Sequence, residues 1–325
     1  MSQLLIPEWF GCGNKLGYFE AIALDELNGA GELRYASADG AKYFRGGRTY
    51  ASSVDKIFQV ALSDSSFSNL ALRHAIADLM CLGAVCDRVD VCFEFSNHST
   101  AAERHNLSAA LFAEAKSLGL EVGKCHSTYG PANALILAVS GRVDGDASNA
   151  QGEVPEGDLV ISGKLGGLGE LYHSALTDDP VRANAFVGCV GKVSIPKTAE
   201  ICSQYKQCTD ISGFGLWGSC DTLARRYRAD LIVDFSKVDC FAEVSERVEA
   251  ACLFAVIDET YIEPSLPPEC RPIALMRELC GPILFMTKSQ HSEGLCRQLA
   301  EAGWTAPAII GKFRAQGRRG TVVCT

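Results

Sequence analysis

The chain has 325 residues, of which 47% are hydrophobic and 21% are charged, and its formal net charge is −9. This length is typical of about two domains, and the apolar fraction is sufficient for a buried core throughout. The acidic balance and the lack of any Lys or Arg run argue against a surface for nucleic acid or for an anionic membrane.

The fifteen cysteines are irregularly spaced, and no Cys-X-X-Cys occurs. This pattern argues against a zinc ribbon or a thioredoxin-type redox pair, and cysteines in apolar stretches behave as small hydrophobes. The N-terminus has no basic region followed by an apolar stretch, and no run of 18 apolar residues occurs. We therefore expect a protein of the reducing cytoplasm.

The first half of the chain contains two helical and several strand-like patterns. Apolar side chains recur at helical spacing in residues 67–84, and residues 101–118 form an amphipathic helical pattern. Strands are predicted at residues 33–36, 49–54, 89–95 and 134–139, and a short one at 119–125. Residues 142–156, rich in Asp, Gly, Ser and Asn, then suggest a linker. We expect one domain over residues 1–150 and a second over 151–325.

The second half alternates in the same way. Strands are predicted at residues 159–162, 230–234, 282–287 and 307–313, and helices at 196–207, 215–228 and 241–253. Alternating strands and helices in both halves predict the α/β or α+β class.

The segment at residues 209–218 has the most chemical content. Asp210, a hard oxygen donor, stands directly before the turn Gly213-Phe214-Gly215, and an apolar helical segment follows. Glycines there can adopt backbone angles closed to other residues and let a ligand approach the main chain. A carboxylate at such a turn suits a metal-bridged polyphosphate. An Asp cap on an ordinary buried helix explains this segment equally well.

Three more carboxylates occupy comparable settings. Asp39 precedes a predicted strand, Asp55 ends one, and Asp78 lies within an apolar helix. A carboxylate among apolar neighbours is costly unless it is paired or bound to a metal. Taken singly, each is better explained as a cap, a turn residue or an ion-pair partner. The hypothesis of a site depends on several of them converging.

Three further segments are open to two interpretations each. Gly163-Lys164 is followed by Leu165 rather than Ser or Thr, so it is not a P-loop, although the glycines at 163–169 could present amides to an anion or form a plain turn. Cys12 lies between glycines and close to Lys15, a setting for a reactive thiol or for an incidental one. His126 follows a predicted strand, where a histidine is more often structural than catalytic.

Taken in order, these segments resemble selenophosphate synthetase (selenide, water dikinase), a family in the superfamily of aminoimidazole ribonucleotide synthetase. The segment Thr209-Asp210-Ile211-Ser212-Gly213-Phe214-Gly215-Leu216 nearly repeats the family's Thr-Asp-Val-Thr-Gly-Phe-Gly-Leu. The other similar segments are Gly11-Cys12-Gly13-Asn14-Lys15, Ala38-Asp39-Gly40-Ala41, Ser52-Ser53-Val54-Asp55, Ala77-Asp78-Leu79, Cys125-His126-Ser127 and Ile310-Gly311-Lys312. The likeness covers essentially the whole chain.

The resemblance implies a two-domain aminoimidazole ribonucleotide synthetase-like α/β fold and a homodimer built through the first domain's sheet. It implies ATP in the cleft, with Mg²⁺ ions held by Asp39, Asp55, Asp78 and Asp210. Lys15 and Cys12 are expected at the chemical step. Lys15, His126, Ser127, Gly213 and Gly215 are expected to contact the nucleotide. Physically this is the carboxylate-and-metal clamp that phosphoryl transfer requires.

The chain also departs from the family. Asn14 stands where the family has a second cysteine, and Met276-Arg277-Glu278-Leu279-Cys280-Gly281-Pro282 stands where it has Asp-Pro-Gln-Thr-Ser-Gly-Gly. Three interpretations therefore stay open. The chain makes selenophosphate from ATP and selenide, uses ATP to activate another acceptor such as an amide, or binds nucleotide without catalysis.

Overall fold

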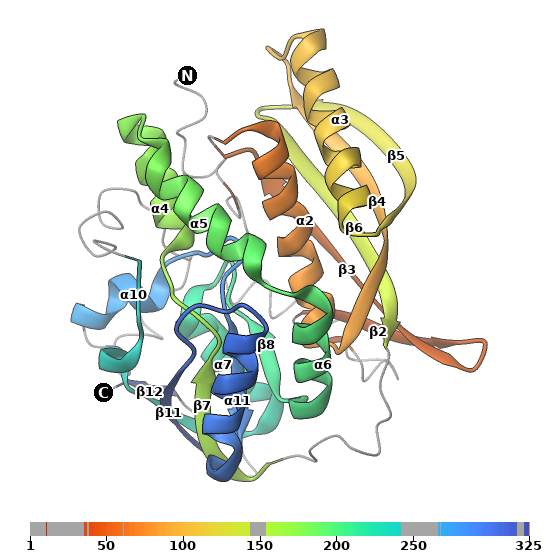
Figure 1. Ribbon diagram of the computed structural model, residues 1–325. Coiled ribbons are helices and arrows are strands. Elements are labelled where there is room, and N and C mark those ends of the chain that lie inside the picture. Colours follow the sequence, from red (N-terminus) through yellow and green to blue (C-terminus); the bar gives the residue numbers. More distant parts are fainter. Residues whose placement is uncertain are drawn as a thin grey trace.

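A computed structural model of the chain describes residues 11, 36–37, 39–60, 62–143, 154–241, 266, 268–316 and 322–324. These residues form two six-stranded sheets with helices packed on them (Figure 1). The mixed α/β class predicted from the sequence is confirmed. The strands of the first sheet lie within residues 36–143 and those of the second within 156–324. The linker predicted at 142–156 overlaps the end of β6 and the start of β7, and its residues 144–153 are outside the described residues.

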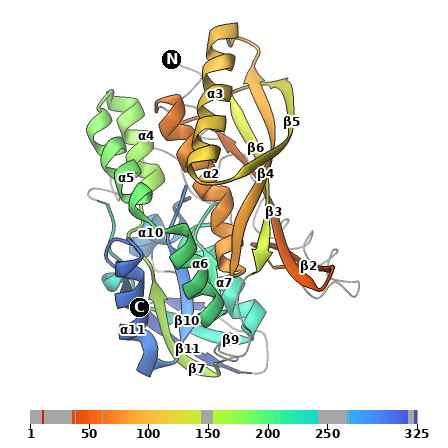
Figure 2. The same ribbon diagram turned by 45° about the vertical axis from the view of Figure 1, so that its right-hand side comes forward.

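The first sheet has the order β1-β2-β3-β6-β4-β5. Its strands are β1 (Ala36–Ser37), β2 (Gly40–Arg45), β3 (Arg48–Phe58), β4 (Ala84–Ser96), β5 (Glu121–Gly130) and β6 (Ala134–Val143). All neighbours are antiparallel except β4 and β5, which α3 (Ala101–Ser117) joins as a crossover. Thr100 and Glu103 form a capping box that fixes the start of α3. Helices α2 (Asp64–Cys81) and α3 pack on one face, as Figure 2 shows.

The second sheet has the order β12-β9-β11-β7-β10-β8. Its strands are β7 (Glu156–Ile161), β8 (Cys208–Asp210), β9 (Ala229–Val233), β10 (Ile283–Thr287), β11 (Ala308–Ala315) and β12 (Val322–Cys324). The helices of this half are α4 (Gly167–Thr177), α5 (Pro180–Lys192), α6 (Ile195–Tyr205), α7 (Gly215–Tyr227), α10 (Arg271–Leu275) and α11 (Ser289–Glu301). Two 3₁₀ turns lie at Phe235–Lys237 and Pro268–Cys270.

Helix α2 joins the two halves. It contacts β3, β4 and β6 on one side and α5, α6 and β8 on the other, so one apolar core continues from the first sheet to one face of the second. A second apolar cluster lies between the other face of the second sheet and helices α7 and α10. All five residues of β10 are buried because helices cover both faces of its sheet. The consequence for function is that α2 and β8 meet at the junction of the halves.

No helix among the described residues is long and apolar enough to cross a membrane.

Candidate functional site

Three carboxylates predicted as metal ligands converge where α2, β8 and the turn before β2 meet. The ligand oxygens of Asp39, Asp78 and Asp210 all lie within 4.8 Å of one another. Asp39 occupies the turn between β1 and β2, Asp78 the last turn of α2, and Asp210 the end of β8. Asp210 thus joins two carboxylates that precede it in the sequence by more than 130 positions.

Asp39 is 3% exposed, and both of its carboxylate oxygens have partners. The Thr209 hydroxyl donates to Oδ1, and the Arg226 guanidinium lies 3.3 Å from Oδ2. Burial raises the pKa of Asp39, and the charge of Arg226 and the Thr209 hydrogen bond partly offset that effect. The buried Asp39 carboxylate is therefore held in place by residues of β8 and α7.

The surroundings of Asp78 show that Asp55, the fourth predicted ligand, lies near the cluster. Burial raises the pKa of Asp78 well above its ordinary value, and the neighbouring charges of Asp55, Asp210 and Asp39 raise it further. The Ser53 hydroxyl donates to Asp78 Oδ2, and Asp55 lies two residues along β3 on the same face as Ser53. Asp55 lies within β3, which continues to Phe58, so the prediction that Asp55 ends its strand was wrong.

The donor set fits hard divalent cations. Asp39, Asp78 and Asp210 converge, and burial together with the charges of Asp55, Asp210 and Asp39 raises the pKa of Asp78. Carboxylate oxygens are the ligands that Mg²⁺ prefers, and a divalent ion would offset the repulsion. The residues therefore suit Mg²⁺, with Asp39, Asp55, Asp78 and Asp210 as the candidate ligands.

The glycines after Asp210 have a packing role that the sequence did not reveal. Gly215 adopts a φ of +66°, and a Cβ there would lie 2.7 Å from the Ala274 carbonyl oxygen and 2.8 Å from that of Met276. The position that a Cβ of Gly215 would take therefore lies against the backbone of α10 and of Met276, which follows α10, and leaves no open space for a ligand. Gly213, which is buried in the turn before α7, remains a predicted nucleotide contact.

The backbone amides of the glycine cluster at 163–169 are occupied by a carboxyl group of the chain itself. The Glu278 carboxylate accepts hydrogen bonds from the backbone N–H of Gly166 at 2.6 Å and of Gly167 at 3.1 Å. These amides begin α4, whose N-terminus favours negative charge. Glu278 is 1% exposed, and burial raises its pKa to about 8 even though the backbone N–H groups of Gly166, Leu168 and Gly167 lower it.

His126 and Ser127 lie away from the carboxylates within the chain. Both are exposed on β5, the edge strand, three strands from β3. Across the sheet, His126 pairs with Cys92, Cys92 pairs with Ile136, and Ile136 pairs with Lys56. Paired residues share a face of the sheet, and neighbours along a strand lie on opposite faces. His126 therefore lies on the face of Lys56, opposite α2 and Asp55. The predicted residues Cys12 and Lys15 are outside the described residues. Gly11, which precedes them, is described, and its carbonyl accepts a 2.9 Å hydrogen bond from the Phe58 N–H at the end of β3.

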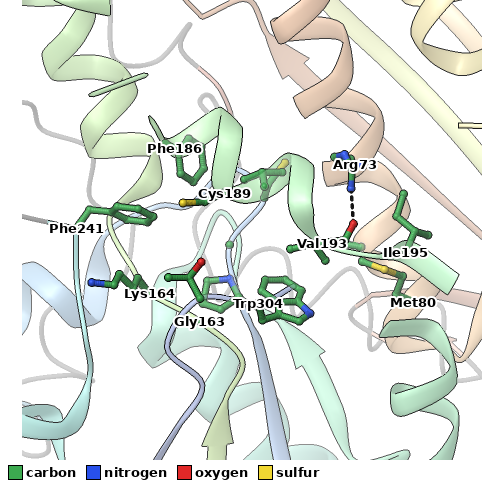
Figure 3. A pocket seen from close by; sticks show the side chains of 16 residues that line it. Arg73, Met80, Gly163, Lys164, Phe186, Cys189, Val193, Ile195, Phe241 and Trp304 are labelled. Atoms are coloured by element: carbon green, nitrogen blue, oxygen red, sulfur yellow. Dashed lines mark hydrogen bonds between the residues drawn. The ribbon is translucent and has the colours of Figure 1, made fainter. Parts of the chain in front are cut away.

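An apolar pocket also lies between the halves (Figure 3). Its aromatic lining comes from Phe186, Phe241 and Trp304, and α2 contributes Arg73, Ala77 and Met80. At about 100° per residue, Arg73 and Met80 lie about 140° and 160° around α2 from Asp78, and Ala77 lies about 100° from it. Helix α2 therefore separates this pocket from the carboxylate cluster.

Three residues of the site were not singled out from the sequence. Arg226 and Ser53 contact the cluster, and Glu278 occupies the amides of α4. Arg226 lies in an Arg-Arg pair near the end of a helix, where the usual interpretation is an exposed cation favoured by the helix dipole. Only the tertiary fold aims it at Asp39.

Solved structures share this architecture over nearly the whole chain. AaThiL complexed with AMPPCP and TMP superposes with a TM-score of 0.67 at 13% identity, over 95% of this chain and 94% of that chain. Thiamine-monophosphate kinase from Stenotrophomonas maltophilia K279a gives 0.61 at 15% identity, over 95% and 96%. Hydrogenase maturation protein HypE in complex with ATP gives 0.55 at 16% identity, over 94% and 86%. The predicted aminoimidazole ribonucleotide synthetase-like fold is thereby confirmed.

No known family's sequence profile matches the chain, and no curated protein sequence matches it significantly. The structural similarities establish the fold, while the narrower resemblance to selenophosphate synthetase stays a prediction.

Proposed function

We propose that the chain is an ATP- and Mg²⁺-dependent phosphotransferase. The observation that carries this proposal is the convergence of Asp39, Asp78 and Asp210 within 4.8 Å, with Asp55 close enough to raise the pKa of Asp78. Aggregated carboxylates are costly unless cations neutralise them, and Mg²⁺ with a polyphosphate is the ligand pair that such a site suits. Solved proteins of this fold carry AMPPCP or ATP, which favours the same ligand class here.

Each residue then has a specific task. The four carboxylates would hold the ions, and bound Mg²⁺ would neutralise charge on the phosphate oxygens. Lys15 would stabilise charge that develops on the transferred phosphoryl group. Gly11, which directly precedes Cys12 in the sequence, accepts a hydrogen bond from Phe58, three residues along β3 from Asp55, and this supports Cys12 and Lys15 as residues of the same site.

A homodimer through the first sheet is part of the proposal. Helices α2 and α3 cover one face of this sheet, whereas Val54 on the other face is 66% exposed. His126 lies on the same face as Val54, since Lys56 and Val54 alternate to that side of β3. In a dimer built on this face, a His126 remote from its own carboxylates could serve the partner's nucleotide.

Selenide is the first candidate acceptor, because Cys12 and Lys15 retain the family's soft nucleophile and cation. The reaction would convert ATP, selenide and water to selenophosphate, AMP and phosphate. A second candidate is an oxygen acceptor such as an amide, activated by phosphorylation. It is favoured by the changed segment 276–282, in which Glu278 fills the α4 amides and donates its own N–H to Ser212, two residues after Asp210.

Calorimetry with AMPPCP and Mg²⁺ tests the nucleotide site. We expect Asp78→Asn and Asp210→Asn to weaken binding at least about tenfold, since each removes a charged metal ligand. Asp87→Asn, an exposed carboxylate change at the start of β4, is the control and should bind like the wild type. Wild-type affinity in both cluster variants would remove the site assignment.

Phosphorus NMR of products, with and without selenide, identifies the acceptor. We expect Lys15→Ala to stop ATP turnover for any acceptor. Cys12→Ser should stop selenide-dependent product formation only if selenophosphate is made, because thiolate chemistry serves a soft acceptor. Full activity of Cys12→Ser beside an inactive Lys15→Ala would exclude the selenide route and favour the amide-type acceptor.

A further inference from the structure

We propose that Arg226 is an exchangeable phosphate-binding residue, which neutralises Asp39 in the ligand-free protein and transfers to a nucleotide phosphate once a divalent ion binds Asp39. This inference rests on the proposed function, since it names a further residue of the same site. It assigns a role to a cation that neither the sequence motifs nor the predicted ligand set contains.

The contact between Arg226 and Asp39 has the geometry of a loose ion pair. Both terminal nitrogens of Arg226 approach the single oxygen Oδ2, at 3.4 Å and 3.3 Å. Charge-assisted hydrogen bonds usually measure about 2.7–2.9 Å, and a tight Arg–carboxylate pair engages both oxygens. Arg226 contacts Oδ2 alone, whereas Oδ1 accepts a hydrogen bond from the Thr209 hydroxyl. The guanidinium is therefore held near Asp39 without being fixed to it.

Two other arginines show what a fixed guanidinium looks like in this chain. Arg73 donates from Nε to Asn69 and from its terminal nitrogens to the carbonyl oxygens of Val193 and Gly191. Arg225, one residue before Arg226 on α7, pairs through Nε with Asp221 one turn earlier. Arg226 instead combines the long contact to Asp39 with a 3.4 Å contact to the Cys208 carbonyl oxygen and a side-chain hydrogen bond with Tyr227. Its side chain keeps 24% exposure, which leaves room for a ligand.

Other cations lie on the same side of the cluster. Burial lowers the pKa of the Lys42 ammonium, and the positive charges of Lys206 and Arg226 lower it further. These three cations come from β2, the turn before β8 and α7, so the fold brings them together. Convergent positive charge beside a carboxylate cluster suits a ligand that carries both metal ions and anionic oxygens.

Binding of the ion and release of Arg226 are coupled through Asp39. Oδ2 cannot coordinate a divalent ion and keep the full attraction of the guanidinium, and the ion repels the guanidinium as well. A nucleotide phosphate arrives with the ion and offers anionic oxygens within reach of the displaced donors. Arg226 thus weakens the binding of a metal ion in the absence of nucleotide and strengthens the binding of the metal–nucleotide complex.

Two titrations of Arg226→Gln test this exchange. The first measures Mn²⁺ binding without nucleotide, and we expect affinity to rise about three- to tenfold, because the competing cation is gone. The second measures AMPPCP binding at saturating Mg²⁺, and we expect affinity to fall about tenfold or more. Arg225→Gln is the matched control, since it removes one charge and one ion pair from the same helix. It should leave both affinities within about twofold of wild type.

The opposite signs of the two effects distinguish exchange from a structural role. If Arg226→Gln weakens both Mn²⁺ and AMPPCP binding, Arg226 only supports the fold of the cluster and the proposal is overturned. Unchanged AMPPCP affinity overturns it too. Arg226→Lys, which keeps the charge if the Gln variant fails to fold, should bind AMPPCP with intermediate affinity. The wild-type titration reports separately on the proposed function, because absence of AMPPCP binding there refutes the nucleotide site itself.

Discussion

The Glu278 carboxylate accepts a 2.6 Å hydrogen bond from the backbone N–H of Gly166. Glycine-rich turns that begin a helix commonly bind a phosphate. Here the chain supplies its own carboxyl group from the segment that precedes β10, and this contact ties that segment to the start of α4. The tie has a measurable dependence on pH, because Glu278 is buried.

Glu278 should make the protein less stable as pH rises from about 4.5 to 8. Burial raises its pKa from an ordinary 4.5 to about 8, so in this range the folded protein holds a proton that the unfolded chain has released. The stabilisation is complete below the unfolded pKa and is lost as pH rises through the folded one. Urea unfolding at pH 5, 6.5 and 8 should show a decline in the free energy of unfolding of a few kcal/mol.

Glu278→Gln removes this titration and should flatten the stability profile. The control is Glu301→Gln, an exposed change at the end of α11, which should keep the wild-type slope. An equal slope in the wild type and in Glu278→Gln would show that Glu278 is already ionised at pH 5.

Asp78→Asn should stabilise the metal-free protein while removing its response to Mg²⁺. Burial and three neighbouring carboxylates disfavour the charged form of Asp78, so a neutral amide relieves repulsion by about 1–3 kcal/mol. Thermal unfolding with EDTA should therefore give a higher Tm for the variant than for the wild type. Added Mg²⁺ should raise the wild-type Tm by mass action and leave that of the variant unchanged. A variant that is less stable in EDTA would mean that Asp78 is not under repulsion.

Thr209→Val should destabilise the chain by about 1–3 kcal/mol, because it leaves Oδ1 of the buried Asp39 without its hydroxyl donor. Thr209→Ser keeps the hydroxyl and should lose less. Urea unfolding of the two variants at neutral pH measures the difference. A loss in Thr209→Val no larger than that in Thr209→Ser, which lacks only the methyl group, would show that the hydrogen bond to Asp39 adds little to stability.

Elements with strong local periodicity were predictable from the sequence. The helices predicted at 196–207 and 215–228 correspond to α6 and α7, and the strand at 230–234 corresponds to β9. Helix α4 was missed because it begins within the glycine cluster at 163–169, and α5 and α11 were not predicted at all. The predicted helix at 241–253 lies almost entirely outside the described residues. His126 was predicted just after a short strand, but β5 runs on through it to Gly130.

The candidate site was predictable to the extent that it follows local motifs. Asp39, Asp78 and Asp210 were chosen for their local settings, and the fold brings them together. The partners of these carboxylates were not predictable, because Arg226 reaches Asp39 across 187 positions and Glu278 reaches Gly166 across 112. Such contacts depend on how elements that are distant in sequence pack against each other, which no local pattern specifies.

Two glycine substitutions separate packing at the site from ordinary helix propensity. Gly215→Ala places a Cβ 2.7–2.8 Å from the carbonyl oxygens of Ala274 and Met276, at a φ of +66°. We expect a loss of about 2–4 kcal/mol, since backbone strain and a backbone clash add. Gly188→Ala, within α5 where a Cβ meets nothing within 4 Å, should instead gain about 0.5–1 kcal/mol. Urea unfolding measures both, and a tolerated Gly215→Ala would show that α10 can move away from the turn after Asp210.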